Sequence, residues 1–188
     1  ILRYANTKTL TRPNYSDIIP LYNISAGSRS VEYRNPYLEP GVSKNNDYVV
    51  SFNNKHLGLL TFSYFNKKIE GLIFSSGQRY ITDASLYGLP RYAETYRIND
   101  YKANNPYVVD LDGFEIDYQT RFWYLPKLLR GLVFNANYTR TNSEVKYPRT
   151  VIETKVIFDP SFQVVTLNLD SLYVDRLLDQ PRDIVNLS

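Results

Sequence analysis

Hydrophobic and polar side chains alternate with a period of two residues in several segments of this chain. The clearest example is GFEIDYQTRFWY at residues 113–124, where aromatic and aliphatic side chains alternate with charged and amide side chains. Successive side chains of a β-strand point to opposite faces, so this pattern predicts a strand with one apolar and one polar face. Similar strands are predicted at residues 47–53, 60–64 and 131–139, and strands without a clean face at 1–10 and 183–188.

The connections between the predicted strands alternate in length. Short turns are expected at residues 53–58 (NNKHLG) and 125–131 (LPKLLRG), and long connections at roughly 11–46, 66–110 and 142–181. In an antiparallel meander every second connection lies at the same end, so the short turns share one end and the long loops share the other. Outer-membrane β-barrels have this asymmetry, whereas loops longer than about 15 residues are uncommon in compact soluble domains.

The two faces of the predicted strands fit a membrane wall. The apolar face carries no charge between Phe114 and Tyr124, as lipid requires, because Lys or Arg near the bilayer centre costs about 2–4 kcal/mol. The set expected to face lipid comprises Tyr48, Val50, Phe52, Leu60, Phe62, Tyr64, Phe114, Ile116, Tyr118, Phe122, Leu132, Phe134, Ala136 and Tyr138. The set expected to face a hydrated lumen comprises Asp47, Ser51, Thr61, Ser63, Glu115, Asp117, Gln119, Arg121, Asn135 and Asn137.

These patterns predict an all-β fold, an antiparallel meander that forms part of a large transmembrane barrel in the outer membrane of a Gram-negative bacterium. Bacterial barrels of this type have about 8 or more strands, so six predicted strands indicate a section of a larger wall. The chain also begins without Met. We therefore expect residues 1–188 to be a single partial barrel domain, with the remaining strands outside it.

Five stretches, in order along most of the chain, resemble the TonB-dependent outer-membrane receptors in the form common among Bacteroidetes. TLTRPNYSDIIP is similar to a strand end and the start of an external loop, and RNPYLEPGVSKNND to the return into the barrel. LGLLTFSYFNKK is similar to the strand that follows. Residues 113–143 resemble a strand, periplasmic turn and strand, and DQPRDIVNLS resembles the return before the final strands.

The resemblance implies the C-terminal half of a barrel of about 22 strands that surrounds a plug domain, with its long loops outside the cell. It implies import of a scarce ligand, such as a siderophore, cobalamin, a glycan or a peptide, driven by the inner-membrane TonB complex. The plug and the TonB-contacting part lie outside this chain. Partners would therefore be lipid, the rest of the barrel and plug, and possible outer-membrane subunits. No residue of this chain is assigned to ligand binding by the resemblance.

Composition argues against several other classes of protein. The chain has 22 Lys+Arg and 19 Asp+Glu, a formal charge of +3, without the dense basic run typical of nucleic-acid binding. It contains no cysteine, and its one histidine, His56, lies in a predicted turn, so neither a zinc site nor a serine triad is expected. Asp110 and Asp112 offer oxygen ligands for calcium, but a turn before a strand explains them equally well. We expect no enzyme activity, cofactor or metal.

Tyrosine is unusually frequent, with 18 residues, and many tyrosines fall in the predicted loops. They suit stacking on a sugar or an aromatic siderophore, but packing of the loops against each other explains them too. The loop tyrosines are Tyr15, Tyr22, Tyr33, Tyr37, Tyr80, Tyr87, Tyr92, Tyr96, Tyr101 and Tyr107. Two alternative functions stay open: a structural, receptor-like subunit of a larger outer-membrane complex, and a soluble carbohydrate-binding β-sandwich. A sandwich would bury Phe114 and Ile116 in a core, whereas a barrel wall would leave them exposed.

Overall fold

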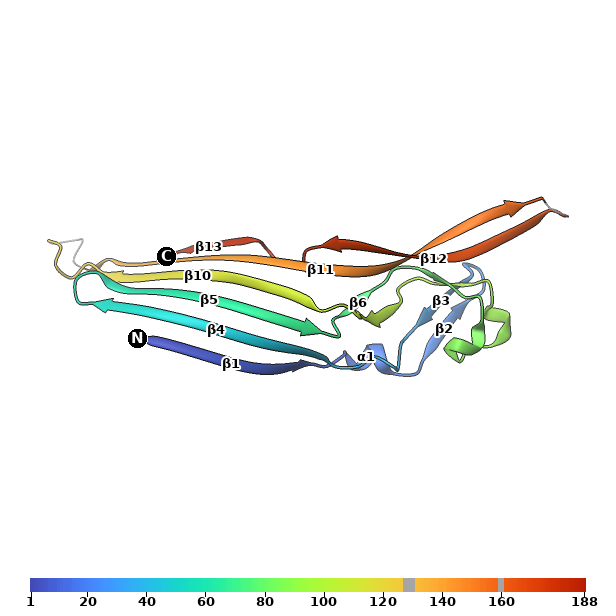
Figure 1. Ribbon diagram of the computed structural model, residues 1–188, viewed down its shortest axis with the longest axis horizontal. Helices are drawn as coiled ribbons and strands as arrows, with labels where there is room; N and C mark the ends of the chain where they lie inside the picture. Colours follow the sequence, from blue (N-terminus) through green and yellow to red (C-terminus); the bar gives the residue numbers. More distant parts are fainter. Residues whose placement is uncertain (127–130, 159–160) are drawn as a thin grey trace.

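The computed structural model describes residues 1–126, 131–158 and 161–188, and its largest element is a long antiparallel sheet (Figure 1). Neighbouring strands follow the order β1–β4–β5–β10–β11, and β13 pairs with the other edge of β11. Their bounds are β1 Leu2–Thr11, β4 Gly41–Asn54, β5 Gly58–Glu70, β10 Val109–Arg121, β11 Val133–Ile157 and β13 Asp183–Leu187. The predicted antiparallel meander is confirmed, and we call this sheet the wall.

The turn between β4 and β5 is built by two residues that the sequence places there. The side-chain oxygen of Asn54 accepts hydrogen bonds from the backbone N–H groups of His56 and Leu57, at 2.9 and 3.3 Å. Gly58 has φ +86°, and a Cβ there would collide with the carbonyl oxygen of Gln119. Only glycine tolerates both constraints. The other predicted short turn, at 125–131, lies partly outside the described residues.

The connection predicted as a long loop at roughly residues 142–181 is a strand hairpin over most of its length. β11 continues to Ile157 and pairs with β12 (Gln163–Asp175) in a long hairpin. The segment has many β-branched residues, which favour strands, but Pro148 and several polar residues mask its alternation. Pro148 is accommodated because it lies beyond Glu144, the last residue of β11 that pairs with β10. Residues 176–182 then interrupt the ladder before β13, held by the Arg176 guanidinium that donates to the Thr141 carbonyl at 2.9 Å.

The two other long connections fold together into a small unit, which we call the cap (residues 12–40 and 71–108). Its first half contains α1 Tyr15–Ile18, β2 Tyr22–Ser25 and β3 Ser30–Tyr33. Its second half contains β6 Ile73–Ser75, β7 Arg79–Tyr80, η1 Ala84–Tyr87, η2 Arg91–Ala93, β8 Arg97–Ile98 and β9 Lys102–Asn104. A four-stranded sheet, β2–β3–β8–β7, joins the two halves, because β3 pairs in parallel with β8. A separate pair is formed by β6 and β9.

The cap has its own hydrophobic core. Val31, Ile81, Ala93 and Ile98 are fully buried, and Ala84 and Leu89 complete the cluster. Figure 1 shows the cap at one end of the wall, beside the base of the β11–β12 hairpin. Within the described ranges, no helix combines the length and hydropathy needed to cross a bilayer.

Two copies of the tripeptide Asn-Pro-Tyr make the same local contacts, the first within the cap and the second between the cap and β11. In both copies the asparagine side-chain oxygen accepts from the tyrosine N–H at 3.0 Å, Asn35 from Tyr37 and Asn105 from Tyr107. The asparagine amide then donates to a strand carbonyl, that of Lys102 for Asn35 at 3.0 Å and that of Lys146 for Asn105 at 2.9 Å. Each motif therefore fixes the point where a connection returns toward a strand.

Candidate functional site

Over the part of the wall nearest the β4–β5 turn, one face is apolar, and the strand register brings its residues from different strands together. Val50 lies opposite Phe62, Phe62 opposite Ile116, and Ile116 opposite Tyr138. The members of the set expected to face lipid that lie in strands all fall on this face, because they occupy even positions in paired strands. Phe122 and Leu132 lie just beyond the strand ends and are joined by a backbone hydrogen bond of 3.0 Å.

The apolar face remains uncovered in the described residues. Phe52 is 66% exposed, Phe62 is 45% exposed and Ile116 is 38% exposed. Aromatic rings touch along the face rather than being buried beneath it: Tyr4 and Tyr48 have ring centroids 5.0 Å apart, and the centroids of Phe114 and Tyr138 are 5.8 Å apart. A soluble sandwich would cover such a face with a second sheet, so the exposed fractions argue against that alternative.

The opposite face of the wall is polar over most of its length, and its side chains bond to each other. Glu115 accepts from the Asn137 amide, and Gln119 donates to Asp117 at 3.1 Å. The hydroxyls of Ser51 and Thr61 share a hydrogen bond of 3.1 Å. The whole set expected to face the lumen lies on this face by register, including Asp47 and Arg121. We call the two sides the apolar face and the polar face.

The polar face changes character where it approaches the cap. There, Val109, Val145 and Tyr147 are almost completely buried, together with Phe74 of β6. The rings of Phe74 and Tyr147 have centroids 5.6 Å apart. The β6–β9 pair therefore packs on the polar side of the wall and leaves the apolar side uncovered. Sequence reasoning missed this contact, although residues 145–147 continue the alternation of the strand before them.

Nine of the ten predicted loop tyrosines divide into two groups, and the tenth, Tyr80, lies in β7, where its backbone bonds to the Asn168 side chain. Tyr33, Tyr87, Tyr96 and Tyr101 pack against the core of the cap. Tyr33 meets Tyr87 edge to face with ring centroids 5.5 Å apart, and burial raises the pKa values of both phenols above 10.0. Others are exposed and free of that core: Tyr15, Tyr22, Tyr37, Tyr92 and Tyr107. Packing thus accounts for the first group, and the second group keeps the stacking hypothesis open.

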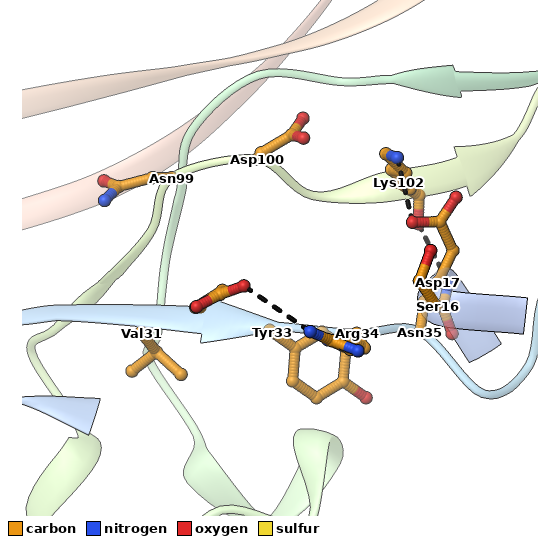
Figure 2. Close-up of a pocket in the computed structure, with 10 residues that line it drawn as sticks. Ser16, Asp17, Val31, Tyr33, Arg34, Asn35, Asn99, Asp100 and Lys102 are labelled. Atoms are coloured by element: carbon orange, nitrogen blue, oxygen red, sulfur yellow. Dashed lines mark hydrogen bonds and ion pairs between the residues drawn. The ribbon is translucent and has the colours of Figure 1, made fainter. Parts of the chain in front are cut away.

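A polar cavity of about 510 Å³ lies in the cap on the side of β3 that faces away from its core (Figure 2). Figure 2 shows the side chains of Val31 and Tyr33 on the core side of the strand. Around the cavity, Lys102 Nζ lies 3.0 Å from Asp17 Oδ1. Arg34 lies 3.8 Å from Glu32, and Asn99 and Asp100 approach from the opposite side. The lining offers many hydrogen-bond donors and acceptors, with positive and negative groups interspersed.

Three further residues considered in the sequence, His56, Asp110 and Asp112, lie in ordinary structural elements. His56 lies in the β4–β5 turn against the ring of Trp123, with centroids 5.5 Å apart. Asp110 and Asp112 lie within β10, so the interpretation of this pair as a turn before the strand is wrong. In the part of the chain that the structure describes, no group of three or more His, Asp or Glu side chains is arranged to hold a metal ion.

Comparison with known proteins gives one match, and it covers nearly the whole chain. A family model described as "TonB dependent receptor-like, beta-barrel" matches residues 2–188. No curated protein and no solved structure matches the chain. The family match agrees with the antiparallel wall, its two unlike faces and its short and long connections.

Proposed function

Because this chain belongs to the family of TonB-dependent receptor-like β-barrels, we propose that it supplies wall and cap to a receptor that imports a scarce ligand using inner-membrane energy. The family places the protein among receptors and transporters of the bacterial outer membrane. The wall would be a section of a barrel of about 22 strands. A plug domain, coupled to TonB, would fill the lumen beside the polar face.

One observation carries the orientation of the proposal: the β6–β9 pair of the cap packs on the polar side of the wall, and the apolar side stays exposed. In a barrel, the apolar side meets lipid and the polar side meets water. The cap would therefore cover part of the lumen entrance. The short β4–β5 turn lies at the other end of the wall (Figure 1), which would be the periplasmic end, where barrels have short turns.

The cavity in the cap is the best candidate for first contact with the ligand. It lies among side chains that donate and accept hydrogen bonds, and its two ion pairs are partly exposed. Such pairs are worth little in water, so a polar ligand can displace them. This chemistry suits a siderophore, a glycan or a peptide better than an apolar compound.

Site-directed labelling of single cysteines in the whole receptor tests the orientation. This chain contains no cysteine, so any cysteine in the remainder of the receptor would first be replaced. A membrane-impermeant maleimide should label Tyr92→Cys in intact cells, because Tyr92 is 67% exposed in the cap. Leu57→Cys, in the β4–β5 turn, should be labelled only after the outer membrane is opened. Equal labelling of both in intact cells would refute the orientation.

Uptake measurements test the ligand site. Cells carrying the whole receptor or one of its variants would be grown on one limiting nutrient at a time: a ferric siderophore, cobalamin, an oligosaccharide or a peptide. Growth with and without the receptor would be compared for each nutrient. The double variant Arg34→Ala/Lys102→Ala should reduce growth on one of them, whereas Arg91→Ala, elsewhere in the cap, should not. If growth on every nutrient is indifferent to the receptor, import is not its function.

A structural role in a larger outer-membrane complex is a second candidate, favoured by the β11–β12 hairpin. Near its tip Phe158 is 75% exposed and Phe162 is 66% exposed, with ring centroids 5.5 Å apart. Large exposed apolar patches often mark interfaces. Replacing both by serine should dissociate a purified complex without affecting nutrient uptake if the receptor is a scaffold.

A further inference from the structure

A second cavity, of about 440 Å³, adjoins the polar cavity of the cap at the place where the cap meets the β11–β12 hairpin. Gln78 and Arg97 of the cap and Thr150 of β11 border it. Asn99 borders both cavities, and Figure 2 shows Asn99 at the end of the first cavity that lies away from Lys102. Each cavity is within the range of about 300–1,000 Å³ typical of ligand sites, so together they can hold an elongated ligand.

The first cavity has more acidic than basic groups. Its charged lining residues are Asp17, Glu32, Asp100, Arg34 and Lys102. Two ion pairs join four of these groups, Lys102 with Asp17 and Arg34 with Glu32. Asp100 is left over: its carboxylate accepts from the Ser75 hydroxyl, and within the described residues it forms no ion pair. The first cavity therefore offers one carboxylate to a cationic group of a ligand.

The second cavity has the opposite character. Arg97 and Arg149 border it, and among the described residues no carboxylate does. Thr150 is buried, so its strand neighbour Arg149 points to the other face of β11, and Arg97 is the cation of this cavity. Asp170 lies nearby, where it accepts from the Thr150 hydroxyl at 2.9 Å. The Arg97 guanidinium forms no ion pair in the part of the chain that the structure describes, so it is open to an anionic group.

The strand register fixes the spacing between the acidic and the basic groups. β3 and β8 run parallel, with Val31 beside Ile98, and both side chains are buried in the core of the cap. The next residue of β3, Glu32, and the preceding residue of β8, Arg97, therefore lie on the other face. Two residues along the strands and one strand across put their Cα atoms about 8 Å apart. Asp100 follows Arg97 by three residues, so their Cα atoms are at most about 10 Å apart.

We propose that the two cavities bind a short peptide with free ends, its ammonium group at Asp100 and its carboxylate at Arg97. This rests on the proposed function, because it names the ligand class of the cavity that receives the ligand first. At about 3.3–3.6 Å per residue, a peptide of about two or three residues spans the two charges. Asn99 lies between them in the chain, where its amide can bind the peptide backbone. A neutral glycan has no charged group for either end, so the charge pattern favours a peptide.

Isothermal titration calorimetry of the purified whole receptor in detergent tests the proposal. The probes are trialanine with free ends, N-acetyl-trialanine, trialanine amide, and maltotriose as a neutral glycan of similar length. The test variants are Arg97→Gln and Asp100→Asn; the second keeps a side-chain oxygen that accepts from Ser75. The matched controls are Arg91→Gln and Glu144→Gln, which remove the same charges from residues that border neither cavity.

Trialanine should bind the wild type and both controls equally, and each blocked peptide should bind the wild type about 10-fold more weakly, because it loses a hydrogen bond to a charged group. Arg97→Gln should weaken binding of trialanine about 10-fold and leave binding of trialanine amide unchanged, since that probe has no carboxylate. Asp100→Asn should likewise weaken binding of trialanine and leave binding of N-acetyl-trialanine unchanged. A structural disturbance of the cap would instead weaken all three peptides alike. That result would overturn the proposal, as would absence of trialanine binding or tighter binding of maltotriose.

Growth measurements separate this failure from failure of the proposed function. If growth on a siderophore, cobalamin or an oligosaccharide depends on the receptor while trialanine does not bind, import stands and only the peptide proposal falls. If trialanine binds with the expected dependence on Arg97 and Asp100 but growth on every nutrient is indifferent to the receptor, import falls and the peptide site stands.

Discussion

The wall and the cap place the same kinds of side chain in opposite arrangements. In the wall, Phe62 and Ile116 are exposed on a flat face while Glu115 and Asn137 bond to each other on the other side. In the cap, Ile81 and Ile98 are completely buried, and the polar side chains line an open cavity. The two regions are adjacent along the chain, yet each is folded for a different solvent.

The cap and the wall therefore obtain their stability from different interactions. The cap buries apolar surface away from water, so its strands of two to four residues depend on the shared core. The wall rests on long backbone ladders between its neighbouring strands, and in the proposed barrel its apolar face would gain from contact with lipid. Damage to the core should therefore loosen the cap alone, whereas damage to the apolar face should disturb the wall alone.

The largest expected effect is loss of the cap core. Ile98→Ala removes a fully buried side chain, which costs about 2–5 kcal/mol. Hydrogen exchange of the whole receptor should show faster exchange in the cap, with wall strands unchanged. Leu86→Ala is the control, because Leu86 lies in the cap but is 72% exposed. Equal loss of protection in β4 and β5 would show that cap and wall form one cooperative unit.

A smaller effect is expected from a charge on the apolar face. Phe62→Arg should lower the free energy of unfolding in lipid vesicles by about 2–4 kcal/mol, because the charge would enter the hydrocarbon layer. Ser63→Arg is the matched control, since the next residue points to the polar face, near Glu115. Phe62→Ala measures the loss of the ring, including its contact with Phe114, without an added charge. If both arginines cost the same, the two faces do not meet different solvents.

The sequence predicted the wall well and the cap poorly, for a physical reason. Long strands repeat a period of two over many residues, so residues 113–121 suffice to indicate a strand and both its faces. The strands of the cap are too short to show a period, and β3 pairs with β8 across 67 residues of chain, Ser30 with Arg97. No local pattern encodes such a pairing.

The candidate site shows the same limit. Arg34 and Asp17 lie in the first long connection, where no local pattern marks either of them as part of a site. Their cavity exists because Lys102 reaches Asp17 from a connection 85 residues away. Chemistry that depends on two connections becomes visible only in the fold.

The smallest expected effect is a dependence of the cap on alkaline pH. Burial raises the folded-state pKa of Tyr33 and of Tyr87 above the ordinary value of 10.0, because it disfavours the charged phenolate. Their contribution to stability is therefore fully present below pH 10.0 and is lost as the pH rises through the raised pKa. Ultraviolet titration of tyrosinate should show a component above pH 10.0 in the folded receptor that disappears in denaturant. Tyr33→Phe should reduce this component; a reduction only at lower pH would mean that the cap admits water to its core.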